Sequence, residues 1–542
     1  MQGLMQQTPL TLDGIFRRAE TFWPTKRLTT ATPSGRERTD YGTWAARTRR
    51  LGGALEDLGV SADGRVATFA WNTARHLELY FAAPCTGRVL HTLNIRLFAE
   101  QLVYIANHAE DEVVFVDRSL LPLLWPVVDD FKSIHHVVVM DDTGSAGPEI
   151  PDDPRIVDYE QLIAAATPHP FGVVTDESTA ASMCYTSGTT GEPKGVVYSH
   201  RSVVLHSMTE MMVDAAGVGE SDVVLPVVPM FHANAWGLCQ TGVLAGSEIV
   251  FPGADLSPAA IAALITEEGV TVAAGVPTIW MGALQFLAGR RHSLRSILCG
   301  GSAVPRSLGE AYRTEVGVPI LQAWGMTETS PLASVARIRS DRQAEADSEE
   351  ALADLRATQG IPVPNVELRI ADPGTGEALP WDDTSTGEVQ VRGPWVAREY
   401  YNDPRGAASF TDDGWLRTGD VAAVRPDGYI RLVDRTKDLI KSGGEWVSSV
   451  DLENHIMSHP SVAEAAVIAV PSEKWMERPL ACVVVKAGET LTEEEVMEWL
   501  RPRVPRWWLP DGVEFIEEVP KTSVGKFSKK DLRERFADRR VP

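Results

Sequence analysis

The stretch from Cys184 to Val197 has the composition of a phosphate-binding loop. It reads CYTSGTTGEPKGVV and combines hydroxyl side chains and glycines with one lysine, Lys194. Glycines leave backbone N–H groups unobstructed, hydroxyls add donors and the lysine adds positive charge, so the loop could wrap the oxygens of a polyphosphate. The same residue types build ordinary surface turns. Taken alone, the loop leaves both a phosphate site and a plain turn open.

The loop does not match the Walker A motif. That motif requires G-x-x-x-x-G-K-[ST], whereas here Pro193 precedes Lys194, and Gly195 and Val196 follow it. A kinase or a P-loop NTPase is therefore disfavoured.

Length and charge limit the classes of protein. At 542 residues the chain exceeds what one hydrophobic core usually supports, so we expect two or more domains. Hydrophobic residues make up 44% and charged residues 23%, as in ordinary globular proteins. The formal net charge of -23 disfavours nucleic-acid binding, so an anionic substrate would need a local cluster of donors and cations.

Targeting signals and cysteine pairs are not evident in the sequence. No apolar run approaches the roughly 18 residues of a membrane span, and the start, MQGLMQQTPLTLDG, lacks the basic and apolar regions of a secretory signal. The cysteines show no CxxC or Cys/His spacing, so we expect reduced core thiols in a cytoplasmic protein. They are Cys85, Cys184, Cys239, Cys299 and Cys482.

The elements that must position the loop belong to an α/β fold. From about residue 43 to 330, helical patterns such as TARHLELYFAAP alternate with β-branched runs such as DEVVFVD and VTVAAGV. This alternation predicts two βαβ lobes of parallel sheet covered by helices. Ligands of such sheets bind at the carboxyl ends of the strands, and the loop follows a strand-like run.

The character of the sequence changes near residue 360. Short strand-like pieces joined by Gly, Asp and Pro turns predict a small β subdomain, and the acidic segment 341–355 predicts a solvated helix. A second change, after DRTKDLIKSGGEW, predicts a small α+β domain. We expect an N-terminal domain over 1–433 (lobes about 1–170 and 171–360, β subdomain about 361–433), a hinge at 434–437 and a mobile C-terminal domain over 438–542.

Seven motifs occur in the order and approximate spacing of one family. They are TSGTTGEPKG, GGSAVP (300–305), QAWGMTETSP (322–331), GEVQVRG (387–393), GWLRTGD (414–420), DRTKDLIKSGGEW (434–446) and PKTSVGK (520–526). With them the whole chain resembles the acyl-CoA synthetases of the adenylate-forming superfamily, which also includes luciferases and the adenylation domains of peptide synthetases. VVYSHRSVVLHS, LPVVPMFHANAW and LIKSGGEWVSSVDLEN resemble medium- and long-chain fatty-acyl-CoA synthetases most.

The resemblance implies a two-step reaction with ATP, Mg²⁺ and coenzyme A. A carboxylate attacks the α-phosphate of ATP to give acyl-AMP and pyrophosphate, and a thiolate then displaces AMP. Because both first-step reactants are anionic, the site must neutralise charge as well as position groups.

The resemblance also assigns residues to the first step. Glu328, with the Thr186 hydroxyl, matches the magnesium ligands, since these oxygens suit a hard cation that keeps several waters. Lys526 matches the lysine that reaches the α-phosphate and the attacking carboxylate. An isolated glutamate or lysine would otherwise be only a solvated surface charge. The other nucleotide contacts on the phosphate side are Ser187, Gly188, Thr189, Thr190, Lys194 and Thr327.

The adenosine side is implied in the same way. Asp420 matches the acid that binds the ribose hydroxyls, and Arg435 lies nearby. Gly300 and Gly301 let the backbone approach the adenine. Gln322, Ala323 and Trp324 line the pocket, with the indole stacked on the purine, although AWG replaces the commoner GYG of the family and removes its phenol hydroxyl.

The second step is implied to use the C-terminal domain. In the family this domain rotates between the two steps, withdraws the lysine that matches Lys526 and presents the segment from Lys441 to Trp446. Lys437 occupies the hinge position. Gly443 and Gly444 would leave room for the pantetheine arm, although such a pair also forms simple turns.

For the acyl group, the motif FHANAW matters most. His232 matches a residue beside the reacting carboxylate, Ala233 lies in the acyl pocket and Trp236 matches a bulky residue that gates it. Both His232 and Trp236 could instead be plain core side chains. Chain length stays open, because a hydrophobic pocket discriminates by only about 1 to 3 kcal/mol per methylene.

Other readings remain beside a fatty-acid ligase. The acid could be short or functionalised, such as a methylthio- or aryl-alkanoate, and the acyl group could pass to an acceptor other than coenzyme A. A peptide-synthetase module would carry an acid near FHANAW, where His232 stands, and would be followed by a carrier domain, which we do not expect after residue 542. A luciferase-like oxygenase would share every motif, whereas a sensor without chemistry would not need Lys526. A homodimer is suggested by the resemblance alone.

Overall fold

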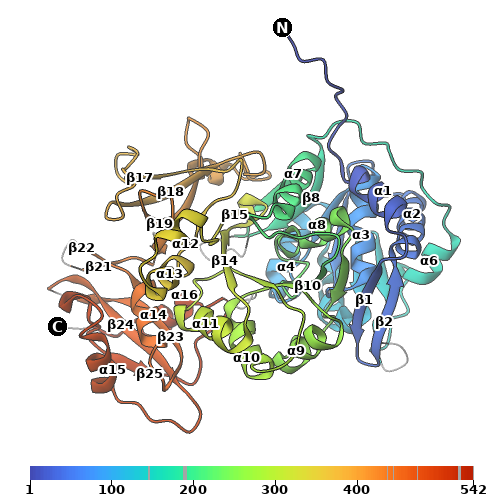
Figure 1. The fold of residues 1–542 in the computed structure, drawn as a ribbon. Helices are drawn as coiled ribbons and strands as arrows, with labels where there is room; N and C mark the ends of the chain where they lie inside the picture. The colour runs from blue at the N-terminus through green and yellow to red at the C-terminus, as the bar shows by residue number, and fades with distance from the viewer. Residues whose placement is uncertain are drawn as a thin grey trace.

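The architecture comes from a computed structural model of the chain (Figure 1). It describes residues 1–143, 147–186, 192–435, 438–442, 445–472, 474–522 and 526–540. The strands form four sheets, two large and mostly parallel, two small and mostly antiparallel.

The first large sheet has seven strands in the order β7-β6-β5-β3-β4-β8-β9. All neighbours are parallel except β8 and β9. Its central strands are runs of Val, Ala and Phe buried on both faces, as expected for a parallel sheet covered by helices. The strands are β3 (Arg65–Phe69), β4 (Val89–Thr92), β5 (Asp111–Asp117), β6 (His136–Met140), β7 (Ile156–Asp158), β8 (Ala180–Tyr185) and β9 (Gly195–Ser199). The helices that connect or cover them are α2 (Tyr41–Asp57), α3 (Ala74–Cys85), α4 (Ala99–Ala109), α5 (Leu121–Leu124) and α6 (Tyr159–Ala165).

The second large sheet has nine strands in the order β16-β15-β14-β13-β12-β10-β11-β1-β2. Its strands are β1 (Arg27–Thr32), β2 (Gly35–Asp40), β10 (Val223–Pro226), β11 (Glu248–Phe251), β12 (Val272–Gly275), β13 (Ser296–Cys299), β14 (Ile320–Gly325), β15 (Leu332–Val335) and β16 (Ile361–Pro362). Its helices are α1 (Leu12–Phe22), α7 (His200–Met211), α8 (Leu238–Ala245), α9 (Pro258–Glu267), α10 (Pro277–Leu287) and α11 (Arg306–Ala311). Ser199 caps α7 and accepts a hydrogen bond from the amide of Ser202.

The two sheets do not divide at residue 170. The N-terminal hairpin of β1 and β2 joins the second sheet through parallel pairing of β1 with β11, and β8 and β9 extend the first sheet to Ser199. The lobes expected at about 1–170 and 171–360 therefore exchange strands. The physical reason is that strand pairing follows which backbone edges meet in space, which order along the chain does not dictate.

The β subdomain is a four-stranded antiparallel sheet, β17-β18-β19-β20, shown at the upper left of Figure 1. Its strands are β17 (Glu367–Ala371), β18 (Thr386–Arg392), β19 (Leu416–Val424) and β20 (Ile430–Arg435). The acidic segment before it forms two helices, α12 (Ser340–Glu345) and α13 (Glu349–Arg356), and not one. Ser348 starts the second by accepting from the amide of Ala351, and Leu352 and Leu355 are buried beneath it.

The C-terminal unit lies beside α10, α11 and α13 in Figure 1 and has its own sheet, ordered β22-β21-β24-β23 with β25 on β24. Its strands are β21 (Ile440–Ser442), β22 (Glu445–Val447), β23 (Val462–Ser472), β24 (Met476–Val485) and β25 (Val513–Phe515), and its helices are α14 (Ser449–Met457), α15 (Glu493–Leu500) and α16 (Lys529–Arg535). The chain changes sheets between β20 and β21, the stretch that contains the predicted hinge. The division into domains and the rotation stay predictions.

The expected fold class, two α/β lobes with a β subdomain and a small α+β C-terminal unit, is confirmed. All five cysteines are buried and free, as the scattered spacing predicts. In the part of the chain that the structure describes, no helix has both the length and the apolar character to cross a membrane.

Candidate active site

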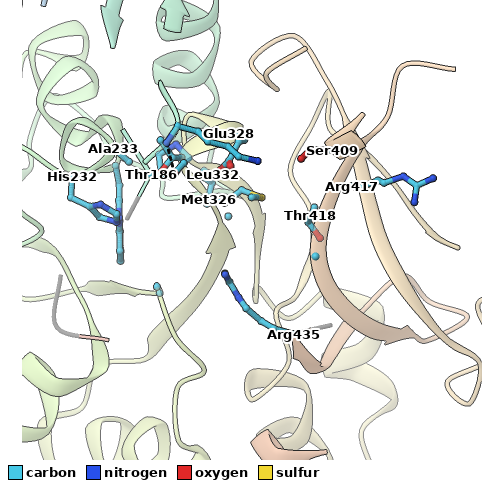
Figure 2. Close-up of a pocket in the computed structure, with 18 of the residues that line it drawn as sticks. Thr186, His232, Ala233, Met326, Glu328, Leu332, Ser409, Arg417, Thr418 and Arg435 are labelled. Carbon is cyan, nitrogen blue, oxygen red and sulfur yellow. Dashed lines mark hydrogen bonds between the residues drawn. The ribbon is translucent and has the colours of Figure 1, made fainter. Parts of the chain in front are cut away.

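A cavity of about 730 Å³ lies where the large sheets, the β subdomain and the C-terminal unit meet. Its walls come from the carboxyl ends of strands, as expected of an α/β sheet. Figure 2 shows His232 and Ala233 on one side, Thr418 and Ser409 on the other, and Glu328 and Met326 between them. The residues predicted from sequence that line it are Thr186, Lys194, His232, Ala233, Trp236, Gly300, Gly301, Ala323, Thr327, Glu328, Arg435 and Lys526.

The candidate phosphate loop joins two antiparallel strands. It leaves β8 at Thr186 and enters β9 after Lys194, and these two residues close it with two hydrogen bonds. The Thr186 amide donates to the Lys194 carbonyl at 2.9 Å, and the Lys194 amide donates to the Thr186 Oγ1 at 3.1 Å. The predicted contacts Ser187, Gly188, Thr189 and Thr190 lie outside the described residues.

Glu328 is the carboxylate at the centre of the cavity. It lies in the short helix η6 (Thr327–Thr329) after β14, is 6% exposed, and accepts a hydrogen bond from the Tyr400 hydroxyl at 2.6 Å. Burial raises the pKa of its carboxyl above the usual value, while the hydrogen bond from Tyr400 opposes this. The Lys194 ammonium lies 4.6 Å from the centre of the Tyr400 ring. Tyr400 therefore links the phosphate loop to the glutamate.

Glu328 and Thr186 both line the cavity and fit a magnesium ion shared with a nucleotide. Over the described residues, no group of three or more His, Cys, Asp or Glu side chains could hold a metal by itself. Mg²⁺ is commonly held by one or two protein oxygens, waters and substrate phosphates. A buried carboxylate beside a phosphate loop suits that arrangement.

The adenosine side contains a three-residue chain of contacts. The Trp324 indole Nε1 donates to the Asp420 Oδ2 at 2.9 Å, and the Arg435 Nε lies 3.0 Å from the Asp420 Oδ1. Asp420 and Arg435 are directly opposite each other on β19 and β20. All three line a second cavity of about 250 Å³, which shares Gly301, Ala323 and Lys526 with the first.

Gln322 lines this second cavity but its amide is already used. Its Oε1 accepts from the Val304 amide at 2.8 Å, and its Nε2 donates to the Thr358 carbonyl at 2.9 Å and the Ala357 carbonyl at 3.2 Å. The polar atoms of Gln322 are therefore used in hydrogen bonds within the protein, and an adenine base would contact only the apolar part of the side chain.

Gly300 and Gly301 follow β13 and have close neighbours. A Cβ on Gly300 would lie 2.4 Å from the Ala323 carbonyl oxygen, so only glycine fits. Gly301 has a φ of +83°, and a Cβ there would lie 3.0 Å from the Lys526 Cε. The lysine of the C-terminal unit thus packs directly against the glycine turn of the second large sheet.

Lys526 faces both cavities and is half-buried. Removal from water and the nearby charge of Arg435 lower the pKa of its ammonium to about 8, although Asp420 and Glu328 pull in the opposite direction. Burial, with the Lys526 charge as a second cause, lowers the pKa of His232 to about 3. His232 is therefore a neutral imidazole at pH 7.

The acyl motif forms an unusual left-handed turn. Residues 233–237 all have positive φ, from +43° at Ala233 to +80° at Gly237. Such a run is rare for non-glycine residues and costs energy, so it is found where surrounding structure imposes it. The turn buries Trp236 to 9% exposure at the cavity wall, where its ring edge would lie 3.5 Å from a Cβ on Gly300.

Of the residues predicted for the second step, Lys441 is described and lines neither cavity. Lys441 is exposed on β21, and its amide donates to the Glu477 Oε2 at 2.8 Å. Trp446 pairs with it across β22. Lys437, Gly443 and Gly444 lie outside the described residues. The structure thus places the described residues predicted for the first step around the two cavities and leaves Lys441 outside them.

Sequence reasoning missed several residues that line the cavity. Tyr400 and Glu210 are buried members of this group, and Glu192, Glu388, Arg405 and Arg417 add charges. Arg405 pairs with Glu192 at 2.8 Å across the end of the phosphate loop. Neither carries a clear sequence signal, because Glu210 lies in a helix of mixed polar and apolar residues, HRSVVLHSMTEM, and Tyr400 lies in a loop without periodicity.

Comparison with known proteins agrees with this geometry. Residues 16–401 match the family described as AMP-binding enzyme, and residues 451–526 match the AMP-binding enzyme C-terminal domain. The chain is 46% identical over 539 residues to a long-chain-fatty-acid–CoA ligase of Thermus thermophilus, covering 98% of this chain and 96% of the relative. It is 43% identical over 546 residues to a 3-methylmercaptopropionyl-CoA ligase of Ruegeria lacuscaerulensis, covering 99% of both. It is 41% identical over 543 residues to a medium-chain-fatty-acid–CoA ligase of Ectopseudomonas oleovorans, covering 99% and 98%.

Solved structures show the same fold. ATP-bound MatB from Rhodopseudomonas palustris superimposes with a TM-score of 0.81 at 26% identity, covering 97% of this chain and 99% of that one. The anthranilate CoA ligase AuaEII in complex with anthranoyl-AMP superimposes with a TM-score of 0.86 at 24% identity, covering 99% of both. The first-step residues around one cavity and full-length relatives lead to one conclusion: the chain belongs to the AMP-binding enzyme family and is an ATP-dependent, AMP-forming acid–CoA ligase.

Proposed function

We propose that the acid is a medium- or long-chain fatty acid and that the residues of the 730 Å³ cavity carry its adenylation. The observation that carries the proposal is that Lys526, Glu328 and His232 line one cavity, which Trp236, Leu298 and Leu332 also line. The names of the relatives at 46% and 41% identity support a fatty acyl group.

In the first step, a carboxylate oxygen of the acid attacks the α-phosphorus of ATP. The bond from that phosphorus to the bridging oxygen breaks, and pyrophosphate leaves. The Lys526 ammonium lies where it can neutralise both the carboxylate and the α-phosphate, which otherwise repel each other. Neutral His232 can orient the carboxylate without removing its charge.

Glu328 and the Thr186 hydroxyl would hold Mg²⁺, which would neutralise charge on the phosphates when bound. Tyr400 fixes the orientation of Glu328 through its hydrogen bond. Asp420, held by Trp324 and Arg435, is placed to accept hydrogen bonds from the ribose hydroxyls. Lys194 and the backbone of the phosphate loop would receive the leaving pyrophosphate.

In the second step, the thiolate of coenzyme A attacks the acyl carbonyl, and the bond to AMP breaks. Lys526 occupies the site in the present arrangement and Lys441 lies outside it, which supports a rotation about Lys437 between the steps. After rotation, Lys441, Trp446, Gly443 and Gly444 would line the path of the pantetheine arm. Homodimerisation stays a prediction from resemblance.

A second candidate substrate is a short functionalised acid. The relative named a 3-methylmercaptopropionyl-CoA ligase is 43% identical over the full length, close to the value for the fatty-acid relatives. Overall identity therefore does not choose between a thioether acid and a plain alkyl acid.

A panel of acids tests the proposal. Straight-chain acids from C2 to C18, aryl-alkanoates and methylthio-alkanoates are each incubated with the enzyme, ATP, Mg²⁺ and coenzyme A, and kcat/KM is measured from pyrophosphate and acyl-CoA. The highest values are expected between C6 and C18. A maximum at a methylthio- or aryl-alkanoate would select the second candidate, and acyl-AMP without acyl-CoA would point to another acceptor. No exchange of labelled pyrophosphate into ATP with any acid would overturn the adenylation mechanism.

A further inference from the structure

Glu210 is a buried acid in the cavity with no part in the reaction described above. It lies near the end of α7, is 1% exposed, and lines the same cavity as His232, Trp236 and Lys526. None of the seven motifs contains it. A carboxyl group in this position needs an explanation, because acidic side chains are almost never fully buried without a partner.

The carboxyl of Glu210 has one polar partner. The Thr241 hydroxyl of α8 donates to its Oε2 at 2.6 Å, and among the described residues no cation forms an ion pair with it. Burial raises the pKa of this carboxyl to about 8, so it is mostly protonated at pH 7. A protonated carboxyl both donates and accepts hydrogen bonds. One hydrogen bond from Thr241 leaves that capacity largely unused.

The cavity that Glu210 lines also has an apolar part. Trp236, Ala233, Leu298 and Leu332 line the same space, and all are apolar. Gly237, the last residue of the left-handed turn, packs against both His206 and the acid, because a Cβ there would lie 2.6 Å from the His206 Nδ1 and 3.3 Å from the Glu210 Oε2. The turn that presents Trp236 to the cavity is thus in contact with the acid. A plain alkyl chain in contact with Glu210 would offer its carboxyl no hydrogen bond beyond the one from Thr241.

We infer that Glu210 is a specificity-determining residue that hydrogen-bonds an uncharged oxygen function, a hydroxyl or a ketone, on the tail of the acid. This inference rests on the proposed function and refines its substrate class from a plain fatty acid to an oxygenated one. The carboxyl OH donates to the substrate oxygen, and a substrate hydroxyl can also donate back. A site built to bond a substrate oxygen discriminates against the analogue that lacks it far more than an apolar pocket discriminates by size.

A purely structural role is the competing explanation. Glu210 and Thr241 could serve only to fasten α7 to α8, which pack closely. In that case the pair would affect stability, and the acyl preference would not depend on it. The two roles therefore predict different ratios of kcat/KM for an oxygenated acid to kcat/KM for the matching alkanoate. A general loss of folding lowers both values and leaves this ratio unchanged.

Chain-matched acids test the inference on the parent enzyme. Alkanoates of one length are compared with the hydroxy-acids carrying the hydroxyl at successive carbons, the oxo-acids and the terminal amino-acid, with kcat/KM taken from pyrophosphate release. One position of the oxygen is expected to raise kcat/KM about tenfold or more over the alkanoate. If the alkanoate equals or exceeds every oxygenated acid, or if the amino-acid is best, the inference is wrong.

Variants assign the preference to the residue. Glu210→Met keeps the length of the side chain but loses its hydrogen bonding. The variant should lower kcat/KM for the preferred oxygenated acid about tenfold and leave kcat/KM for the alkanoate equal or higher. Glu210→Gln should keep most of the preference, because its carbonyl can accept from Thr241 while its amide donates to the substrate. Thr241→Val is the control for a purely structural role, because it removes the same hydrogen bond between α7 and α8. If Glu210→Met and Thr241→Val lower Tm alike while the ratio of acids stays at the parent value, Glu210 is structural and the inference fails.

The failure of this inference is distinct from failure of the proposed function. If the parent enzyme releases no pyrophosphate with any acid of the panel, the function itself is wrong. If it activates acids but shows no higher kcat/KM for oxygenated acids than for alkanoates, only the role of Glu210 is wrong. Because the parent preference is measured without any substitution, a variant that does not fold leaves the test intact.

Discussion

The indole Nε1 of Trp324 donates a hydrogen bond of 2.9 Å to the Asp420 Oδ2, and Arg435 binds the other oxygen of the same carboxylate at 3.0 Å. Asp420 is 4% exposed, so both contacts act away from bulk water. A tyrosine in place of Trp324 would bring a hydroxyl in place of the ring N–H. The aromatic side chain of the nucleotide pocket, Trp324, is therefore hydrogen-bonded to Asp420, the acid expected to bind the ribose.

The contact predicts a specific effect of Trp324→Phe. The substitution keeps an aromatic face but removes the N–H donor, so Asp420 is held by Arg435 alone. We expect KM for ATP to rise about three- to tenfold with a smaller change in kcat, as for loss of one buried hydrogen bond. Steady-state kinetics with saturating acid measures this. Trp507→Phe, at a partly exposed tryptophan far from both cavities, is the control, and equal KM values in the two variants would contradict the coupling.

Lys526→Ala should separate the two half-reactions. The lysine faces the cavity from the C-terminal unit, so its loss removes the charge that offsets two anions. Adenylation, measured as pyrophosphate release, should fall about a hundredfold or more. Thioester formation from supplied acyl-AMP should be largely spared. Lys132→Ala, an exposed lysine of the N-terminal domain, is the matched control, and pyrophosphate release at the parent rate in Lys526→Ala would disprove the role.

The lowered pKa of Lys526 predicts that the rate of adenylation decreases at alkaline pH. Burial and Arg435 bring the pKa to about 8 from the ordinary 10.5 of a lysine, so the ammonium is present below pH 8 and is lost as pH rises through that value. If the charged form is the active one, kcat/KM for ATP should fall above about pH 8. His232, with a pKa of about 3, should add no acidic limb between pH 5 and 7.

Lys526→Arg distinguishes this limb from other ionisations. Arginine keeps its charge throughout the range, so the variant should be slower overall but flat between pH 8 and 10. A limb that persists in Lys526→Arg belongs to another group, and the assignment to Lys526 would then be wrong.

Lys441→Ala should affect mainly the step that uses coenzyme A. In the present arrangement Lys441 is exposed and lies outside both cavities, so pyrophosphate exchange should stay within about twofold of the parent. Transfer from acyl-AMP to coenzyme A should slow about tenfold, if rotation brings Lys441 into the site. Single-turnover measurements of each half separate the two. Lys474→Ala, another exposed lysine of the same unit, is the control, and equal damage to both halves would count against rotation.

The sequence by itself determined the fold class and the reaction class, and it predicted candidate residues for the first step. Motifs such as MTETS and RTGD depend on local chemistry: a particular carboxylate, hydroxyl or glycine at a fixed place in a short segment. Alternation of helical and β-branched patterns determined the parallel sheets in the same local way. Such local patterns can be recognised in the sequence without knowledge of the tertiary contacts of their residues.

Only the tertiary structure decided what depends on segments that are distant along the chain. The exchange of strands between the large sheets, the bond from Trp324 to Asp420, and the hold of Tyr400 on Glu328 join residues 70 or more positions apart. The meeting of Glu210 with the acyl cavity is of the same kind, since an acid within a helical pattern reads as solvated until its burial is known. Burial, and with it the pKa of an acid or a lysine, is set by the surrounding side chains, and their positions are determined only when the chain has folded.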